Sequence, residues 1–342
     1  MKNLITIVFL LLSFSISFAF TSDQDEGAGI LWRVSGNGLK SDSYILGTSH
    51  TVPISFLDSL KGFPEVWAQV TQVATETEAA DIMDSVQHGH LKILEKFCAQ
   101  KRKLVAYHLP NMKYKDLYTK SQLAFMDSIL KFFVVSNMTV AEYSPLRLWH
   151  QYLSLRDFSN PHQLSVKDPM DFFKNAMDGM LERRCKSAGK HYFKLEEPFT
   201  FFNALNESVM LVDSCFNLNE QADILYQCAL YEAKSKNRPH VNYLDIAYQE
   251  KNFAKYNDYF VKQTDYIDSL DLPTALKVRL FQYEKKKNEI GGERRTLNWM
   301  DKILTEIKSA PTLVAVGINH FIGENGLIHL LRQHGYTVEP VK

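Results

Sequence analysis

The 342-residue sequence lacks the short motifs that mark the common hydrolases and nucleotide-binding proteins. It contains no H-E-x-x-H zinc motif, no G-x-S-x-G nucleophile turn, no Walker loop and no dinucleotide-binding glycine fingerprint. Each of these motifs places a metal, a nucleophile or a phosphate by a fixed spacing. Serine-nucleophile chemistry and nucleotide chemistry therefore have no support in this sequence.

The sequence also lacks an excess of charge of either sign. Its 39 Lys and Arg residues balance 39 Asp and Glu residues, so the formal net charge is zero. A protein that binds nucleic acid or an anionic membrane surface usually carries a basic excess, and we expect neither partner here. The apolar fraction of 45% and the charged fraction of 23% are typical of a globular protein.

Long apolar runs are absent beyond the first twenty residues. In that N-terminal segment Lys2 precedes an apolar stretch, and Ser17-Phe18-Ala19 supplies small residues at a signal-peptidase site. The pattern predicts a signal peptide over residues 1–20, cleaved after Ala19 or nearby, and an exported protein that is periplasmic or secreted. A retained N-terminal membrane anchor is the alternative. After cleavage we expect no stable membrane insertion.

Closely spaced cysteines are lacking as well. The four cysteines have neither the spacing of a zinc knuckle nor that of a redox dithiol; they are Cys98, Cys185, Cys215 and Cys228. In an exported protein an even number favours disulfides, and the sequence does not choose among the three pairings. Buried free thiols are the alternative interpretation.

Two Gly-x-x-His tetrads are the most informative feature that the sequence does contain. They are Gly47–His50 and Gly317–His320, and each follows an apolar run that predicts a buried strand, at 44–46 and 312–316. A strand that ends in such a tetrad delivers an imidazole to the rim of a sheet, where ligands commonly bind. Convergence of the two imidazoles would suit metal binding or acid–base chemistry. A histidine that caps a turn is the alternative for each tetrad alone.

Two glutamates join the histidines as candidates because each ends a predicted strand. Glu76 lies in a strand predicted over 73–78, where alternation places it on the same face as Glu78. Glu196 follows a strand predicted over 191–195. Glu76 is a candidate metal ligand or general base, and Glu196 a second carboxylate or an orienting group. A salt bridge at the strand end is the alternative, and it is the preferred interpretation of Glu78.

An arginine pair provides the remaining candidate for substrate binding. Arg294 and Arg295 open a predicted helix that contains Trp299, and one of them could hold a substrate carboxylate. Ordinary surface arginines are the alternative.

The predicted elements indicate an α/β (α+β) fold. A hairpin over 30–35 and 43–46 turns at Gly36-Asn37-Gly38, and a helix is expected over 64–72. The C-terminal segment predicts a strand at 312–316, a helix from about Asn325, and a strand over 336–340. We therefore expect a single domain over residues 21–342, with a mixed sheet built from N- and C-terminal segments and flanked by helices. A large helical insertion occupies about 79–310.

These residues resemble the TraB/GumN family, which includes the TIKI-type metalloproteases of animals. The resemblance spans essentially the whole mature chain and is strongest at its two ends. It is carried by Leu31–Val34, Tyr44–His50, Glu76, Tyr143–Pro145, Asp171, Ala176, Gly189-Lys190, Leu195-Glu196, Arg295, Trp299, Val316–Leu327 and Leu330–Val338.

The resemblance implies a fold similar to the erythromycin-esterase-like and ChaN-like group. It also implies a metal-dependent hydrolase site in which His50, Glu76 and His320 hold the ion, with Arg295 and Asp171 on the substrate side. TIKI-type members look like peptidases that prefer manganese or cobalt, and the donor types are also compatible with zinc. Thr296 and Pro169 depart from the family pattern. These two departures bear on the substrate pocket more than on the tetrads.

The leading functional hypothesis is an exported metal-dependent hydrolase that acts on a peptide or protein substrate. The first alternative is a protein that binds a peptide or signal molecule without turnover, as in the pheromone-shutdown members of the family. A weaker alternative is an esterase for a small molecule, which rests on fold analogy alone.

Overall fold

The computed structural model describes most of the chain, and its central feature is one mixed sheet. The described residues are 29–49, 52–78, 113–130, 144–150, 177–235 and 243–341. Within them the sheet has six strands in the order β4-β3-β5-β2-β1-β6. The strands are β1 (Leu31–Ser35), β2 (Ser43–Thr48), β3 (Gln72–Thr75), β4 (His191–Lys194), β5 (Thr312–Gly317) and β6 (Thr337–Pro340).

Four adjacent strands run in the same direction, and this fixes where the predicted site residues emerge. β5 pairs in parallel with β2 and with β3, and β3 pairs in parallel with β4, whereas β1 is antiparallel to both of its neighbours. Thr48 of β2 is the register partner of Gly317 of β5. Residues that follow β2, β3, β4 and β5 therefore emerge at one edge of the sheet.

The N- and C-terminal segments build this sheet together, as the sequence predicts. β1 and β2 form the expected hairpin, and its turn residues Gly36, Asn37 and Gly38 have φ values of 80°, 45° and 78°. The Asn37 side chain donates to the backbone oxygen of His334 at 2.7 Å and so ties the turn to the C-terminal segment. Gly335, the predicted end of the last helix, has φ 83°.

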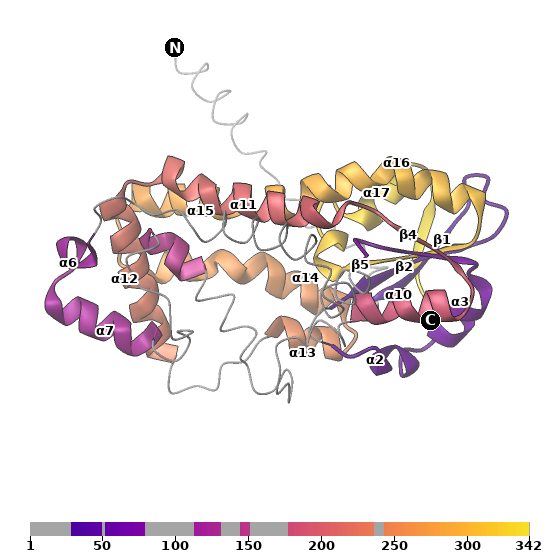
Figure 1. The fold of residues 1–342 in the computed structure, drawn as a ribbon, viewed down its shortest axis with the longest axis horizontal. Coiled ribbons are helices and arrows are strands. Elements are labelled where there is room, and N and C mark those ends of the chain that lie inside the picture. The colour runs from indigo at the N-terminus through magenta and orange to yellow at the C-terminus, as the bar shows by residue number, and fades with distance from the viewer. Residues whose placement is uncertain are drawn as a thin grey trace, which may run out of the picture.

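Helices cover the sheet and extend away from it. α16 and α17 lie on one side of the sheet, and α3 and α10 lie on the other (Figure 1). α11 and α15 lead from the sheet to the opposite end of the molecule, which carries α6, α7 and α12 (Figure 1). The labelled α-helices are α2 (Ser55–Asp58), α3 (Phe63–Gln69), α6 (Tyr114–Leu117), α7 (Lys120–Leu130), α10 (Met177–Ser187), α11 (Pro198–Cys215), α12 (Leu218–Ser235), α13 (Tyr243–Gln249), α14 (Phe253–Val261), α15 (Thr274–Asn288), α16 (Arg294–Ser309) and α17 (Leu327–Gln333). Residues 145–150 are α-helical as well.

The described residues also include three helical segments of other types. They are the 3-10 segments η2 (Lys262–Ser269) and η4 (Ile318–Phe321) and the π-helical segment η3 (Glu289–Glu293). The arrangement as a whole is a mixed α/β fold, which confirms the predicted fold class. The likeness to the ChaN-like group and the division into a domain with an insertion stay predictions.

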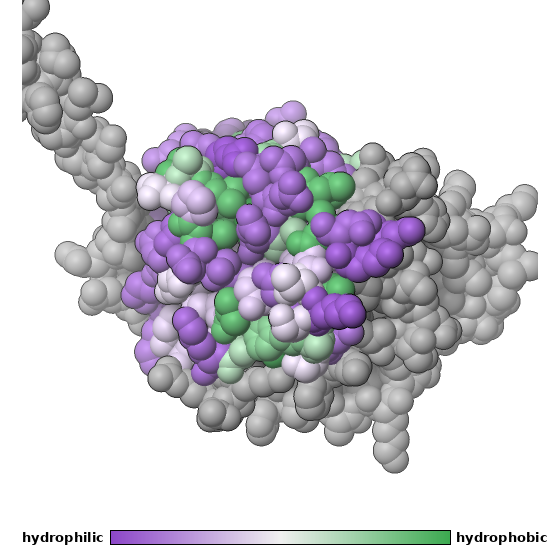
Figure 2. Space-filling model, turned by 90° about the vertical axis from the view of Figure 1, so that its left-hand side faces the viewer, coloured by the Kyte–Doolittle hydropathy of each residue, from purple (hydrophilic) through white to green (hydrophobic). Residues whose placement is uncertain are grey.

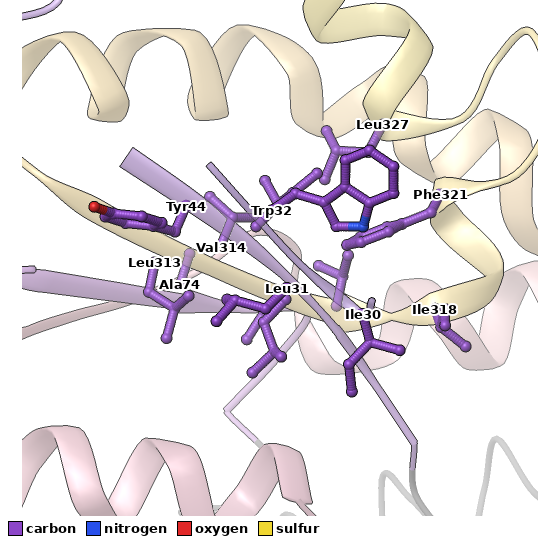
Figure 3. Close-up of a cluster of buried hydrophobic side chains, with 14 of the residues drawn as sticks. Ile30, Leu31, Trp32, Tyr44, Ala74, Leu313, Val314, Ile318, Phe321 and Leu327 are labelled. Atoms are coloured by element: carbon purple, nitrogen blue, oxygen red, sulfur yellow. The ribbon is translucent and has the colours of Figure 1, made fainter. Parts of the chain in front are cut away.

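Two clusters of buried apolar side chains correspond to the two ends of the molecule. The first surrounds the sheet and includes Trp32, Phe321 and Leu327 (Figure 3). Phe253 links its parts, with ring centroids 5.6 Å from Trp32 and 6.2 Å from Phe321. The second cluster lies among α6, α7, α11, α12, η2 and α15. Figure 2 views the molecule from that second end, where polar and apolar side chains are interspersed on the coloured surface.

Two predicted elements end three residues later than they do in the structure. The helix expected over 64–72 is α3, which spans Phe63–Gln69. β3 ends at Thr75 rather than at residue 78, because the Thr75 hydroxyl donates to the Thr77 carbonyl at 2.9 Å and turns the backbone. Arg294 and Arg295 are the first two residues of α16, as predicted, and α15, η3 and α16 follow one another without a break. Gly291 and Gly292 lie within the π-helical segment instead of breaking the helix.

Other predictions are tested only in part. Cys185, Cys215 and Cys228 are free thiols, which agrees with the alternative interpretation, and Cys98 lies outside the described residues. The predicted signal peptide lies outside them too. Among the helices that the structure describes, none has the length and apolar character needed to cross a bilayer.

Gly47 provides a test of how tightly β2 packs against the segment after β5. A Cβ atom at this position would lie 2.9 Å from Ile318 Cγ1 and 3.3 Å from Ile318 Cα. We expect Gly47→Ala to lower the free energy of unfolding by about 1–3 kcal/mol, because overpacking forces this buried contact apart. Gly29→Ala is the matched control, since its Cβ would meet its nearest neighbour at 3.9 Å. Denaturant unfolding compares the variants, and equal stability would contradict the packing described.

Candidate functional site

Side chains from three strand ends meet around one arginine. Glu76 directly follows β3, Glu196 follows β4, and His320 lies in η4 directly after β5. Arg295 reaches all three from α16. The structure therefore brings together four of the residues that the sequence singles out.

The Arg295 guanidinium binds both glutamates at once. Its Nη2 atom lies 2.5 Å from Glu76 Oε2 and 2.5 Å from Glu196 Oε1, and its Nε atom lies 3.0 Å from Glu196 Oε1. The Trp299 indole donates to Glu196 Oε2 at 3.1 Å, and the guanidinium carbon lies 5.0 Å from the Trp299 ring centroid. Arg295 is thus fixed by charge, hydrogen bonds and an aromatic face.

Burial makes these charge interactions strong. The side chains of Arg295, Glu196 and Glu76 are 5%, 6% and 13% exposed. Burial by itself lowers the pKa of Arg295, but the carboxylates of Glu76 and Glu196 outweigh burial and raise that pKa above its usual value. The guanidinium is therefore charged at every working pH.

Glu76 is also bound by the backbone of the second tetrad. Its Oε1 atom accepts from the Gly317 N–H at 2.8 Å. A Cβ at residue 317 would lie 3.1 Å from that oxygen, so the glycine permits this close approach. The same oxygen lies 3.7 Å from His320 Nε2. Gly317 therefore places the predicted carboxylate beside the predicted imidazole.

The hydrogen bonds of His320 define which ring nitrogen carries its proton. The Thr296 hydroxyl donates to the Gly292 carbonyl at 3.1 Å, so its oxygen accepts from His320 Nδ1–H at 2.8 Å. Nε2 is then the nitrogen with the lone pair, and it accepts from Arg295 Nη1 at 3.3 Å. The imidazole is buried and lies against the Trp299 ring, with centroids 4.5 Å apart.

The local helix geometry explains why Arg295 and Thr296 reach the site. Both side chains bond back to the π-helical segment, Arg295 Nη1 to Gly291 O at 3.2 Å and Thr296 Oγ1 to Gly292 O at 3.1 Å. A π-helical turn rotates the residues that follow it and is frequent at functional sites. The turn therefore sets the rotation of α16 at the point where it faces the sheet edge.

Some predicted residues lie elsewhere or are not described. Glu78 forms a salt bridge with Lys194 at 2.8 Å, which confirms the preferred interpretation of that residue. Arg294 pairs with Glu207 at the surface, as an ordinary surface arginine does. His50 and Asp171 lie outside the described residues. The first tetrad is described as far as Ser49.

Sequence reasoning missed the positioning role of two residues. In the sequence, Thr296 is notable only as a departure from the family pattern, and Trp299 only as a residue of a predicted helix that carries part of the family resemblance. The available signal was the position of Trp299 four residues after Arg295, because residues at this spacing are neighbours on a helix surface. Thr296 directly follows Arg295, and helical spacing gives no such signal for it. Neither hydrogen bond to the site could be read from that spacing.

The part of the chain that the structure describes contains no group of three His, Cys, Asp or Glu side chains arranged to hold a metal ion. The predicted ligand set of His50, Glu76 and His320 includes a residue outside that part. Glu76 and His320 are the two predicted ligands that the structure places together.

The buried arginine and its exposed neighbour provide a matched pair for testing the network. Arg295→Met leaves Glu76 and Glu196 buried without their shared cation, and we expect a loss of about 3–5 kcal/mol in the free energy of unfolding. Arg294→Met breaks an exposed pair whose side chains are 44% and 53% accessible, and we expect a loss of no more than about 1 kcal/mol. Equal losses in denaturant unfolding would contradict the buried network.

The tautomer of His320 is open to direct observation by NMR. We expect a proton on Nδ1 in the wild-type protein. This proton should exchange slowly with water, because Nδ1–H donates a hydrogen bond to the Thr296 hydroxyl. Thr296→Ser keeps the acceptor and should keep the signal, whereas Thr296→Val should lose it. His320→Gln assigns the resonance. An Nε2-protonated ring in the wild type would contradict the hydrogen-bond pattern.

Comparison with known proteins agrees with the resemblance found in the sequence. The model of the TraB/PrgY/gumN family matches residues 30–340, nearly the whole chain. No curated protein and no solved structure matches it. Because the match extends from β1 to β6 and includes all the strand ends of the site, the chain belongs to the TraB/PrgY/gumN family.

Proposed function

We propose that this protein is an exported metal-dependent hydrolase that cleaves peptide bonds. The observation that carries the proposal is the meeting of Glu76 and His320 at the carboxyl ends of neighbouring parallel strands, with Glu76 Oε1 3.7 Å from His320 Nε2. Export rests on the N-terminal sequence alone, and the peptide substrate on the family resemblance.

The two donors fit a shared divalent ion. Ligand atoms about 2.1 Å from one ion lie about 3 to 4 Å apart, which includes the observed separation. His320 has the hydrogen-bond arrangement of a metal-binding histidine, because Nδ1–H is held by Thr296 and Nε2 keeps its lone pair. Nitrogen and carboxylate donors without thiolate suit manganese, cobalt or zinc.

His50 is the proposed third ligand, and strand register supports it. Thr48, two residues before His50, is the β2 partner of Gly317, which opens the second tetrad in β5. The tetrads begin one residue out of register, because Gly47 is paired with Val316. Both still leave the same edge of the sheet from adjacent parallel strands, which is what converging histidines require.

Arg295 sets a condition on cation binding. It now donates to Glu76 Oε2 and to His320 Nε2, so a cation held by those residues competes with it. Glu196 can retain the guanidinium through Nε and Nη2. Arg295 would then remain at the rim of the site as a positive group for a substrate carboxylate or a developing oxyanion.

The bound ion would supply Lewis acidity, which lowers the pKa of water and polarises a carbonyl. The chain supplies position and proton acceptance. Glu76 is the carboxylate that reaches His320, so it is the candidate for ligation or for taking the proton of the attacking water. Glu196 is held by Arg295 and Trp299 and acts by fixing Arg295.

Metal analysis and a peptide-library assay test this proposal together. We expect the purified protein to contain a divalent ion and to cleave peptides, with cleavage abolished by a chelator. His320→Ala and Glu76→Gln should each lower metal affinity or activity by more than about 100-fold, the upper range for residues that only support a ligand. His329→Ala, on α17, is the control and should retain both.

Two outcomes would contradict the proposal. One is wild-type metal content in the His50→Ala, His320→Ala double variant. The other is stoichiometric peptide binding without any product, which would favour the binding protein of the pheromone-shutdown type. N-terminal sequencing of the exported protein checks the predicted cleavage near Ala19.

A further inference from the structure

The α13–α14 hairpin sends one buried tyrosine to each Gly-x-x-His tetrad. The Tyr248 hydroxyl, from α13, donates to the Gly47 carbonyl at 2.8 Å. The Tyr256 hydroxyl, from α14, donates to Asn319 Oδ1 at 2.8 Å. Gly47 opens the first tetrad, and Asn319 immediately precedes the histidine of the second. One small unit outside the sheet therefore contacts both tetrads.

The hairpin holds these hydroxyls in fixed places. Tyr248 and Tyr256 are 1% and 7% exposed, and their rings meet edge to face with centroids 6.4 Å apart. Asn252 caps α14 by accepting from the Lys255 N–H at 2.9 Å. The hairpin also contributes Phe253, which packs between Trp32 and Phe321. Movement of either tyrosine would therefore require repacking of the sheet core.

Both hydroxyls act as donors under all working conditions. Burial raises the pKa of Tyr248 and also that of Tyr256. Neither group ionises near neutral pH, so the two hydrogen bonds do not depend on pH. Their contribution is positional rather than one of acid–base chemistry.

A third contact holds the first tetrad from α10, whose Met177 Sδ also lies 3.5 Å from the Tyr248 hydroxyl. The Thr48 hydroxyl donates to Asp178 Oδ1, on α10, at 2.6 Å, and both side chains are buried. The segment that leads to His50 is thus held at its backbone by Tyr248 and at the next side chain by Asp178. In the second tetrad, Tyr256 holds the side chain of Asn319, the residue directly before His320.

We infer, on the basis of the proposed function, that Tyr248 and Tyr256 are positioning residues for the two histidines. They fix the ends of β2 and β5, the two strands that lead into the tetrads. Partners of this kind around metal ligands typically change metal affinity about 10- to 100-fold when removed. Neither residue touches the ion or the substrate.

Phenylalanine variants of the full-length protein test the inference, because they remove only the hydroxyl. Manganese affinity is measured by titration calorimetry, and kcat and KM are measured on a cleaved peptide. We expect Tyr248→Phe and Tyr256→Phe each to weaken manganese binding about 10-fold and to lower kcat more than they raise KM. Tyr259→Phe is the control on the same hairpin, since that ring packs against Tyr243, and it should bind manganese as the wild type does.

A double-mutant cycle separates positioning from general stability. Asn319→Ala removes the acceptor of Tyr256, so Tyr256→Phe should have no further effect on manganese affinity in that background. Additive losses would overturn the inference. So would Tyr248→Phe and Tyr256→Phe variants that unfold more easily but bind manganese with wild-type affinity. Failure of the wild type to bind any divalent ion would instead refute the proposed function, and this inference with it.

Discussion

The buried ion pairs of Arg295 with Glu76 and Glu196 are the constraint on which the site depends. The two carboxylates follow adjacent parallel strands, so they emerge close together at one sheet edge. Two like charges at this depth repel each other and require a shared cation. α16 supplies this cation, Arg295, two residues after the end of the π-helical segment through which the helical rod of α15 and α16 continues. The sheet edge and the helix are therefore linked by charge as well as by packing.

The same network defines the state of His320. Gly317 lets Glu76 approach the backbone, Thr296 accepts a hydrogen bond from Nδ1–H, and the Trp299 ring packs against the imidazole. What results is an imidazole whose Nε2 is an acceptor next to a carboxylate. This arrangement supports cation binding, and Arg295 is the cation that occupies it in the structure. The tyrosines of the α13–α14 hairpin extend the network to the first tetrad.

The sequence predicted the ends of the fold better than its middle. The hairpin and the strand and helix after residue 310 follow from alternation, glycine turns and helical spacing, which are local properties. The predicted end of β3 was wrong, because the Thr75 hydroxyl donates a hydrogen bond to the nearby Thr77 carbonyl where the strand ends. The alternation of polar and apolar residues gives no sign of this hydrogen bond. The fixed orientation of Arg295 could not be predicted from the sequence either, since its partners lie 99 and 219 residues away along the chain. The tetrads indicated where the site lies, but not which residue neutralises its buried carboxylates.

The central claim is that Glu76 and His320 bind one divalent ion. Anomalous diffraction from crystals soaked in manganese tests it most directly. The account predicts a peak between Glu76 Oε1 and His320 Nε2, about 2.0–2.2 Å from each, with Arg295 withdrawn toward Glu196. An ion bound elsewhere, or an Arg295 guanidinium that still bridges Glu76 and His320 in the manganese-soaked crystal, would contradict it.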